Sequence, residues 1–515
     1  MTKTTGAPPL SLSDTRRAGV CLHLTSLPGP YGIGELGAAA RRFVDRLRAM
    51  GIGVWQFLPT GPTAYGDSPY QPLSTFAGNP SLIDVGELIE LGLLRAADVE
   101  ALTELPRDHV DYGRLIARKT ALLERLPDRF QRNANASLRA EYDTFLDNHY
   151  DRWLRDYALF RYLKRRHGER PWPEWEAACR RRDPQAIERA EHDGAASIRV
   201  TLLNQFLFYR QWDALRRYAN ESGVTLFGDM PIYIALDSAD AWASREILRL
   251  DDDGRPSHVA GVPPDYFSAD GQLWGNPLYD WEHHAQTGYA WWVERLRHTV
   301  TMMDMVRIDH FRGFESYWAI PNGATTAKQG EWEPGPGDAI FDAIRRDLGE
   351  LPIVAEDLGE ITPEVDALRE RQRIPGMKVL QFLAADDGFE LDRIGEHCVC
   401  YTGTHDNDTT VGWFNGGPGD RRTAGEILTM QRAVLKHTGG QPATIGHDLI
   451  RLAFASAARL AMAPLQDYLG YGSATRMNTP GSPDGNWRWR MTDADIGAAV
   501  VDTVRGMVEN SRRVR

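Results

Sequence analysis

Three short apolar segments in the second half of the chain each end abruptly in acidic residues. The segments span 305–314, 352–359 and 398–408, and they carry Asp309, Glu356 and Asp406. An apolar run that stops at a polar cluster is typical of a buried parallel strand that ends at a working surface. A single strand-end Asp more often caps the next helix. Three repeats of the same pattern instead predict one shared site.

The spacing of apolar runs along the whole chain predicts eight strands. They lie near 19–24, 52–58, 224–230, 305–309, 352–356, 377–382, 398–402 and 458–465. A helix predicted over 36–50 separates the first two, and long Gly- and Pro-rich loops follow strand ends. This order predicts an α/β fold, a (β/α)8 TIM barrel whose active face is built from the loops after the strands. An open doubly wound sheet is the alternative, but Pro28 and Pro30 in the first turn remove backbone donors that a phosphate loop needs.

Two long segments interrupt the barrel pattern. From about 83 to 219 the sequence is charged and helical without a convincing strand, which predicts an inserted helical subdomain after the second strand. A second irregular stretch, about 250–285, follows the third strand and is predicted to be a loop insertion. We therefore expect a single catalytic domain over 1–515 with these two insertions.

Composition narrows the class of function. The formal net charge of -12 argues against a nucleic-acid partner, because phosphate binding requires a basic surface. Four scattered cysteines make no disulfide framework, and neither a signal peptide nor an uninterrupted apolar run of about 18 residues is evident. We therefore expect a cytoplasmic protein with no membrane partner. Four of the fifteen Trp adjoin Gly, Pro or Asn, where aromatic rings can stack on sugar faces as well as fill a core.

The predicted barrel order brings four carboxylates to one mouth. Asp229 follows the third strand, Asp309 the fourth, Glu356 the fifth and Asp406 the seventh. Cleavage of a glycosidic bond needs such carboxylates and no cofactor. One carboxylate attacks or stabilises the anomeric carbon, and a second, protonated one donates its proton to the leaving oxygen. Anionic neighbours are expected to raise the pKa of Glu356, which suits it to the acid role.

Two further residues bear on this chemistry. Arg307 lies two residues before Asp309, on the same strand face, and is expected to keep the nucleophile ionised or to form a structural ion pair. A metal site at 405–408 is the competing interpretation, but Asp and Asn loops more often cap turns and the closing Glu of a calcium loop is absent. We expect no metal and no cofactor.

Nine ordered motifs carry a family resemblance. They are DSPY at 67–70, FAGNP at 76–80, GDMPI at 228–232, GVPPDYFS at 261–268, GNP at 275–277, RIDHFRG at 307–313, AEDLG at 355–359, GTHDN at 403–407 and RMNTPG at 476–481. Together they resemble the 4-α-glucanotransferases, the amylomaltases of glycoside hydrolase family 77 in the α-amylase clan. The resemblance runs from about Gly19 to Met491.

The resemblance implies a retaining double displacement on malto-oligosaccharides and α-1,4-glucans. It implies that Asp309 is the nucleophile, Glu356 the general acid/base and Asp406 the carboxylate that holds sugar hydroxyls. The substrate-binding residues that it implies are Tyr70, Asp229, Trp274, Arg307, His310, His405 and Asn407.

The residues themselves leave the acceptor open. Water would make the protein an α-1,4-glucan hydrolase, and another glucan would make it a transferase. The aromatic stretch 266–281 could exclude water from the intermediate or pack as a lid on the helical insertion. A non-catalytic glucan-binding barrel is a third possibility, but it predicts the loss of a carboxylate that this chain retains.

Overall fold

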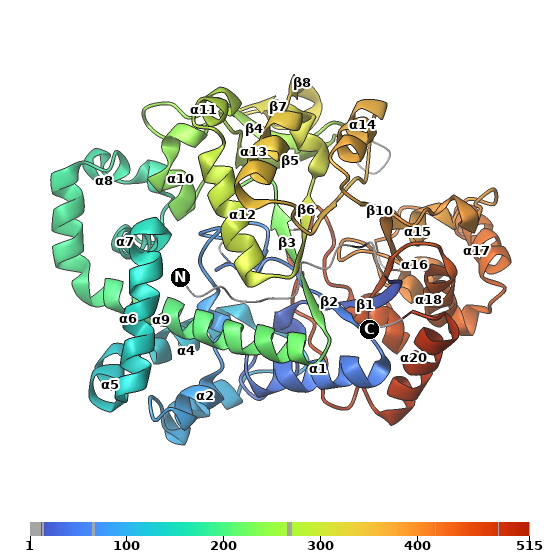
Figure 1. Cartoon of the computed structure of the whole chain (residues 1–515), viewed down its shortest axis with the longest axis horizontal. Helices are drawn as coiled ribbons and strands as arrows, with labels where there is room; N and C mark the ends of the chain where they lie inside the picture. The colour runs from blue at the N-terminus through green and yellow to red at the C-terminus, as the bar shows by residue number, and fades with distance from the viewer. Residues whose placement is uncertain are drawn as a thin grey trace.

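Eight parallel strands form the centre of the molecule (Figure 1). The computed structural model describes residues 12, 15–63, 67–264, 270–417, 419–482 and 484–513. The barrel strands are β1 (Arg17–Cys21), β2 (Val54–Gln56), β3 (Thr225–Pro231), β6 (Met305–Asp309), β9 (Ile353–Ala355), β10 (Gly376–Val379), β11 (Cys398–Tyr401) and β12 (Leu460–Pro464). They pair in the order β10-β11-β12-β1-β2-β3-β6-β9. The Ala355 N–H donates to Pro375 O across the remaining gap at 2.8 Å, so the barrel is nearly closed and the predicted fold is confirmed.

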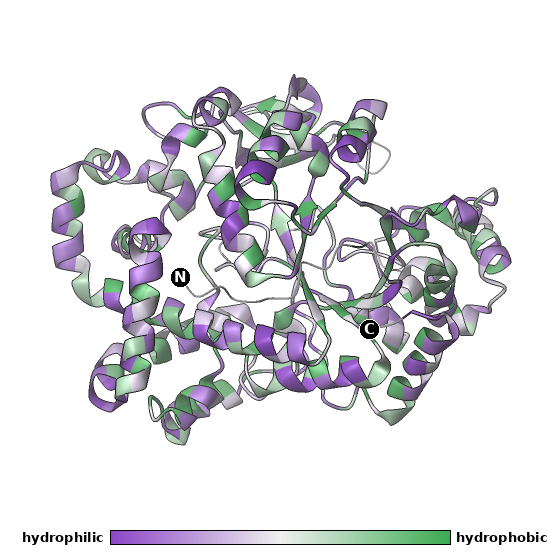
Figure 2. Cartoon of the chain, in the orientation of Figure 1, coloured by the Kyte–Doolittle hydropathy of each residue, from purple (hydrophilic) through white to green (hydrophobic). Residues whose placement is uncertain are grey.

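Apolar side chains fill the barrel interior. Phe227, Met305, Val354 and Tyr401 belong to one buried cluster drawn from the strands. Gly19 packs closely beside it, because a Cβ there would lie 2.0 Å from the sulfur of Met462 and that side chain would have to move. Figure 2 shows hydrophobic residues along these central strands and hydrophilic ones on the outer helix faces. The barrel strands are buried at nearly every position, inward and outward, which explains why they read as nearly continuous apolar runs in the sequence.

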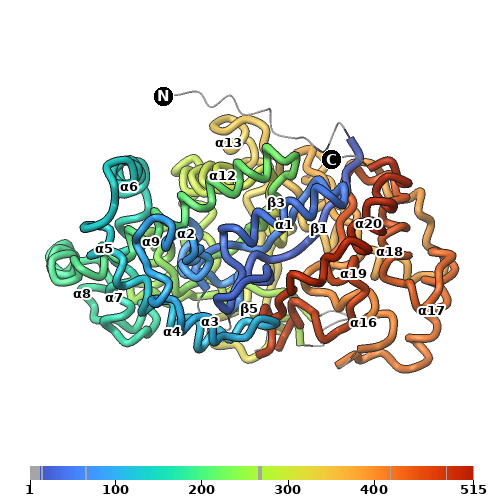
Figure 3. The backbone as a smooth tube through the Cα atoms, turned by 90° about the horizontal axis from the view of Figure 1, so that it is seen from below, coloured from blue at the N-terminus to red at the C-terminus, as the bar shows by residue number. Residues whose placement is uncertain are grey.

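Amphipathic helices surround the strands. The helices that accompany the barrel are α1 (Ala38–Met50), α12 (Ala290–Met302), α13 (Asp338–Leu348), α14 (Pro363–Arg371), α18 (Ile445–Ala455) and α20 (Ala498–Asn510). In α1 the residues at helical spacing, Phe43, Val44 and Leu47, are buried, and Gly51 ends the helix in the left-handed conformation. Figure 3 shows α20 close to α1 and β1. Near the end of α20, Arg513 donates to Arg17 O at 3.0 Å and joins the two ends of the described chain.

Helices fill the chain between β2 and β3. They are α2 (Val85–Glu90), α3 (Glu100–Thr103), α4 (Tyr112–Leu123), α5 (Leu126–Asn133), α6 (Ala136–His149), α7 (Arg155–Arg166), α8 (Ala177–Arg180) and α9 (Pro184–Glu221). The side chain of Asp183 caps the first turn of α9, and Pro184 follows at its first position. Lys164 on α7 pairs with Asp237 beyond β3, and the Trp172 indole donates to Leu236 O at 2.6 Å. These helices are therefore anchored to the loop that follows β3.

A small antiparallel sheet lies among the loops of the barrel. Its strands pair in the order β5-β4-β7-β8, with bounds β4 (His258–Val262), β5 (Gln272–Pro277), β7 (Ser316–Pro321) and β8 (Glu331–Pro334). The stretch 250–285 is thus less irregular than predicted. Of its two short strands, β4 pairs with β7 and β5 pairs in turn with β4, and local sequence cannot show either pairing. Residues 265–269 of the predicted loop lie outside the described residues.

The remaining helices are short except α17. They are α10 (Ala239–Ala243), α11 (Trp281–Gln286), α15 (Leu380–Leu383), α16 (Thr410–Asn415), α17 (Ala424–Thr438) and α19 (Leu465–Leu469). Among the described helices, none combines the length and apolar character needed to cross a bilayer.

Candidate active site

A buried ion network lies at the carboxyl ends of β3 and β6. Arg307 is paired in register with Asp229 on β3, and it donates to both carboxylate oxygens of Asp229 at 2.9 and 2.7 Å. Its second Nη donates to Asp309 Oδ1 at 2.8 Å. The Asp229 side chain is fully buried, whereas that of Asp309 keeps 30% of its surface exposed. Arg307 therefore holds one carboxylate inside the protein and presents the other to the mouth of the barrel.

The electrostatics of Asp309 differ in part from the sequence expectation. Burial raises the pKa of Asp309 above its ordinary value, and the charges of Asp229 and Asp406 act in the same direction. Arg307 lowers that pKa, as predicted, and His405 adds to its effect. Burial outweighs the opposing effect of Arg307. The sequence does not show how far a strand end is withdrawn from water, so this balance was not predicted.

Glu356 directly follows β9 and is held at both oxygens. The backbone N–H of His310 donates to Oε2 at 2.7 Å, and that of Leu358 donates to Oε1 at 2.9 Å. Burial, with Asp309 as a further contribution, raises the pKa of Glu356 to about 7, although Arg307 opposes it. The predicted upward direction of the pKa is confirmed. Its main cause is burial and not the anionic neighbours.

His310 turns the chain between these two carboxylates. It has the left-handed backbone conformation, with φ 55°, which is uncommon for a residue other than Gly and is concentrated at functional sites. Its ring is buried, and burial lowers its pKa to about 3, so the imidazole is neutral. Trp274 on β5 packs edge-on against it, with ring centres 4.8 Å apart. The buried Nε2 has no hydrogen-bond partner within the described chain.

A second group of polar side chains follows β11. Asp406 is 48% exposed and lies 3.4 Å from Nε2 of the buried His405. The Asn478 amide donates to Asp406 Oδ1 at 2.6 Å, and Arg476 donates to the Asp406 carbonyl at 2.6 Å. Asn407 instead accepts hydrogen bonds from the N–H and hydroxyl of Thr404, both at 2.9 Å, which fixes this loop.

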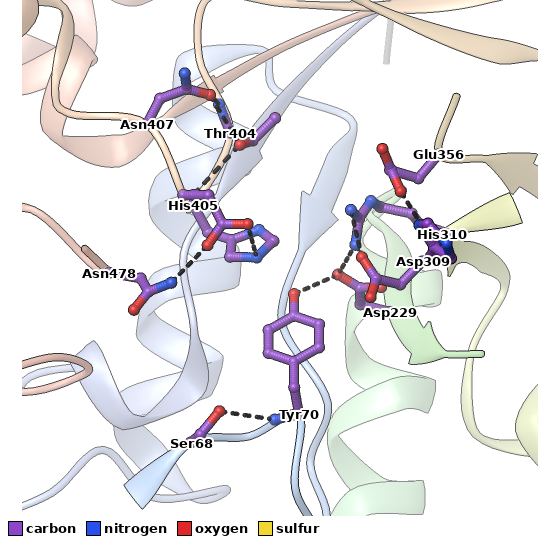
Figure 4. Close-up of polar contacts among 12 residues, drawn as sticks. Ser68, Tyr70, Asp229, Asp309, His310, Glu356, Thr404, His405, Asn407 and Asn478 are labelled. Carbon is purple, nitrogen blue, oxygen red and sulfur yellow. Dashed lines mark hydrogen bonds and ion pairs between the residues drawn. The ribbon is translucent and has the colours of Figure 1, made fainter. Parts of the chain in front are cut away.

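Tyr70 lies between the two groups (Figure 4). Its hydroxyl donates to Asp229 Oδ2 at 2.8 Å, and its ring stacks on that of His405 with centres 5.1 Å apart. We call the residues on its one side the Arg307 cluster and those on its other side the Asp406 cluster. The Arg307 cluster is Asp229, Arg307, Asp309 and Glu356; the Asp406 cluster is His405, Asp406, Asn407 and Asn478. The charge of Asp406 acts on both Tyr70 and Asp309, so the two clusters lie within electrostatic range of each other across Tyr70.

The structure gathers the predicted site residues and adds others. Asn478 and Arg476 hold Asp406, and Trp487 lies 6.1 Å from Tyr70 and 6.0 Å from His405, measured between ring centres. These three residues were not predicted as part of the site. Asn478 and Arg476 belong to the motif at 476–481, which could have indicated them. No sequence motif indicates Trp487, because only its packing brings it to the site.

This arrangement suits acid–base and nucleophilic chemistry at one carbon centre. A carboxylate held by a guanidinium lies beside a carboxyl whose pKa of about 7 lets it give up and recover a proton near neutral pH. Within the described part of the chain, no cluster of three or more His, Cys, Asp or Glu side chains is arranged to hold a metal ion.

The chain is similar to known proteins over nearly its whole length. A family model described as 4-alpha-glucanotransferase, glycoside hydrolase family 77, matches residues 22–495. The 4-alpha-glucanotransferase of Thermus thermophilus is 45% identical over 97% of this chain and 99% of its own length. A potato relative, named as chloroplastic/amyloplastic, is 40% identical over 93% of this chain and 83% of its own. The structure of an amylomaltase from Streptococcus agalactiae in complex with acarbose has a TM-score of 0.92 at 35% identity, covering 97% of this chain and 100% of that one.

Proposed function

The chain belongs to the 4-alpha-glucanotransferase family and is an enzyme of that type, and we propose that it works by a retaining double displacement. In this proposal a segment of an α-1,4-glucan moves from a donor to the 4-hydroxyl of an acceptor glucan or glucose. The observation that supports it best is the pairing of Asp309, held by Arg307, with a Glu356 carboxyl whose pKa lies near 7.

The first step forms a glycosyl-enzyme. An oxygen of Asp309 attacks the anomeric carbon while the bond to the leaving glucan breaks, and Glu356 gives its proton to the leaving oxygen. The guanidinium of Arg307 keeps the attacking carboxylate oriented. In this proposal Asp406 binds hydroxyls of the sugar undergoing reaction, which its exposure and its hydrogen bond from Asn478 support.

The second step reverses the proton transfer. Ionised Glu356 takes the proton from the acceptor's 4-hydroxyl, the hydroxyl oxygen attacks the anomeric carbon, and the ester bond to Asp309 breaks. Two inversions leave the α configuration unchanged. Tyr70, Trp274, His310, His405 and Asn407 are proposed to bind substrate around this centre.

We propose the remaining features from the same premise. Residues 83–219 form a helical subdomain inserted into one catalytic domain, malto-oligosaccharides are the substrates, and no nucleic acid is bound. A cytoplasmic location is proposed from the bacterial relatives, whereas the plant relatives carry plastid names.

Incubation with maltotriose tests the proposal. Transfer gives glucose together with a ladder of longer glucans and leaves the number of reducing ends constant. A steady increase in reducing ends would instead show a hydrolase, and no change in products would leave only glucan binding. The Glu356→Gln variant serves as the matched inactive control, because it keeps the size and shape of the side chain.

A further inference from the structure

A partly exposed tryptophan pair lies on the small antiparallel sheet, outside the clusters described above. Trp332 on the edge strand β8 is paired in register with Trp318 on β7, and their rings pack edge to face with centres 5.1 Å apart. Trp332 is 37% exposed, one of few large hydrophobic side chains in the described chain that reach this degree of exposure. An exposed Trp alone is common on protein surfaces. The way this one is supported distinguishes it.

Arg312 supports the Trp332 ring from below. Its guanidinium carbon lies 3.8 Å from the centre of the ring, and Arg312 itself is 5% exposed. The stacked cation covers one face of the indole, so the part of Trp332 that stays exposed is not the face that Arg312 covers. Trp318 fixes the ring from the side, and its own indole N–H donates to Ala327 O at 2.8 Å. Trp332 is therefore a rigid platform and not a mobile surface side chain.

The same arginine connects this platform to the site. Arg312 lies three residues after Asp309, in the 3₁₀ turn Phe311–Phe314. It donates to the carbonyl of Glu360, in the loop that follows Glu356, and to Ser316 Oγ at 3.3 Å. A general acid faces the oxygen of the leaving sugar, so its loop borders the side of the cleft that receives leaving and acceptor glucans. The Arg312 side chain contacts both this loop and the Trp332 ring, so Trp332 is separated from the loop only by Arg312.

We propose that Trp332, braced by Arg312 and Trp318, is a stacking site for a sugar unit of a long α-1,4-glucan on the leaving-group and acceptor side. The inference rests on the proposed function, because that function identifies the side of Glu356 on which the chain runs. A partly exposed indole held in place by its neighbours suits the apolar face of a glucose ring, and the negative net charge suits a neutral ligand. A short glucan that fills only the cleft would not reach this platform, so the site selects for chain length.

The test compares maltotriose and amylose as substrates of Trp332→Ala. We expect KM for amylose to rise roughly tenfold, the effect of losing one well-packed aromatic contact, with a much smaller effect on maltotriose. Trp332→Phe should recover most of the amylose affinity. Leu428→Ala is the matched control, because Leu428 is 48% exposed on α17, far from β8 in Figure 1. Unchanged amylose kinetics in Trp332→Ala would overturn the proposal.

A binding measurement separates this proposal from the proposed function. Binding is measured in the inactive Glu356→Gln background on native gels that contain amylose. Adding Trp332→Ala should reduce the retardation of the protein, whereas adding Leu428→Ala should leave the retardation unchanged. If the unsubstituted enzyme makes no transfer products but its retardation depends on Trp332, the transfer function fails and the platform stands. If Trp332→Ala loses maltotriose and amylose activity equally together with thermal stability, Trp332 is only a structural cover for Arg312, and the platform is refuted.

Discussion

The Arg307 cluster and the Asp406 cluster face each other across Tyr70, yet they are held in different ways. In the Arg307 cluster, a guanidinium that is 5% exposed bridges Asp229 and Asp309, and burial dominates the pKa of both Asp309 and Glu356. In the Asp406 cluster, the carboxylate is half exposed and is positioned by an amide and by backbone contacts. In the proposed mechanism, the steps that move protons and charge therefore lie in the buried half, and Asp406 in the open half binds sugar hydroxyls. We expect substitutions in the buried half to cost both stability and activity, and those in the open half to cost activity alone.

The largest effect is expected at the two reacting carboxylates of the buried half. Glu356→Gln removes the transferable proton, and Asp309→Ala removes the nucleophile, so kcat should fall by about 10³-fold or more in each. Initial rates of maltotriose disproportionation measure this loss. Glu360→Gln is the matched control, since Glu360 is an exposed residue of the same loop and the substitution leaves in place the backbone carbonyl to which Arg312 donates. Retained turnover in either active-site variant would remove that residue from its proposed role.

Arg307→Lys tests whether a substitution in the buried half lowers both the stability and the activity of the enzyme. One ammonium cannot replace a guanidinium that contacts two carboxylates, so one buried charge loses its partner. We expect a loss of about 3 kcal/mol in the free energy of unfolding and a fall in kcat of roughly 100-fold. Denaturant titration and steady-state kinetics measure the two effects. A stable but inactive variant would contradict the distinction between the clusters.

The pH dependence of activity tests the raised pKa of Glu356. The first step needs Glu356 protonated, and burial together with Asp309 raises the pKa of Glu356 to about 7. Above that pH, kcat/KM should therefore decline by about tenfold per pH unit. The acidic limb reports the ionisation of Asp309, whose pKa is also raised, and Arg307→Lys should move that limb to higher pH because it weakens the cation that lowers this pKa. A profile that stays flat up to pH 9 would be inconsistent with Glu356 as the acid.

The smallest effect is expected in the open half. Asn478→Ala removes the amide that orients Asp406, and kcat should fall by about tenfold, while the free energy of unfolding changes by no more than about 0.5 kcal/mol because the site is exposed. Asn478→Asp is an informative partner, since it keeps the size and replaces attraction to Asp406 by repulsion. A loss of stability in Asn478→Ala as large as that of Arg307→Lys would remove the difference between the clusters.

The sequence by itself determined the order of the barrel strands and the carboxylates at their ends. Apolar runs that stop at Asp309, Glu356 and Asp406 are local patterns, and the geometry of parallel strands brings such ends to one mouth. The tertiary structure alone decided three other features. It pairs β4 with β7 in an antiparallel sheet, and it brings Asn478 into contact with Asp406 and Trp487 beside His405. It also buries Glu356, which raises the pKa of that side chain to about 7. Each depends on segments far apart in the chain, because pairing, packing and loss of hydration are set by neighbours in space and not by neighbours in sequence.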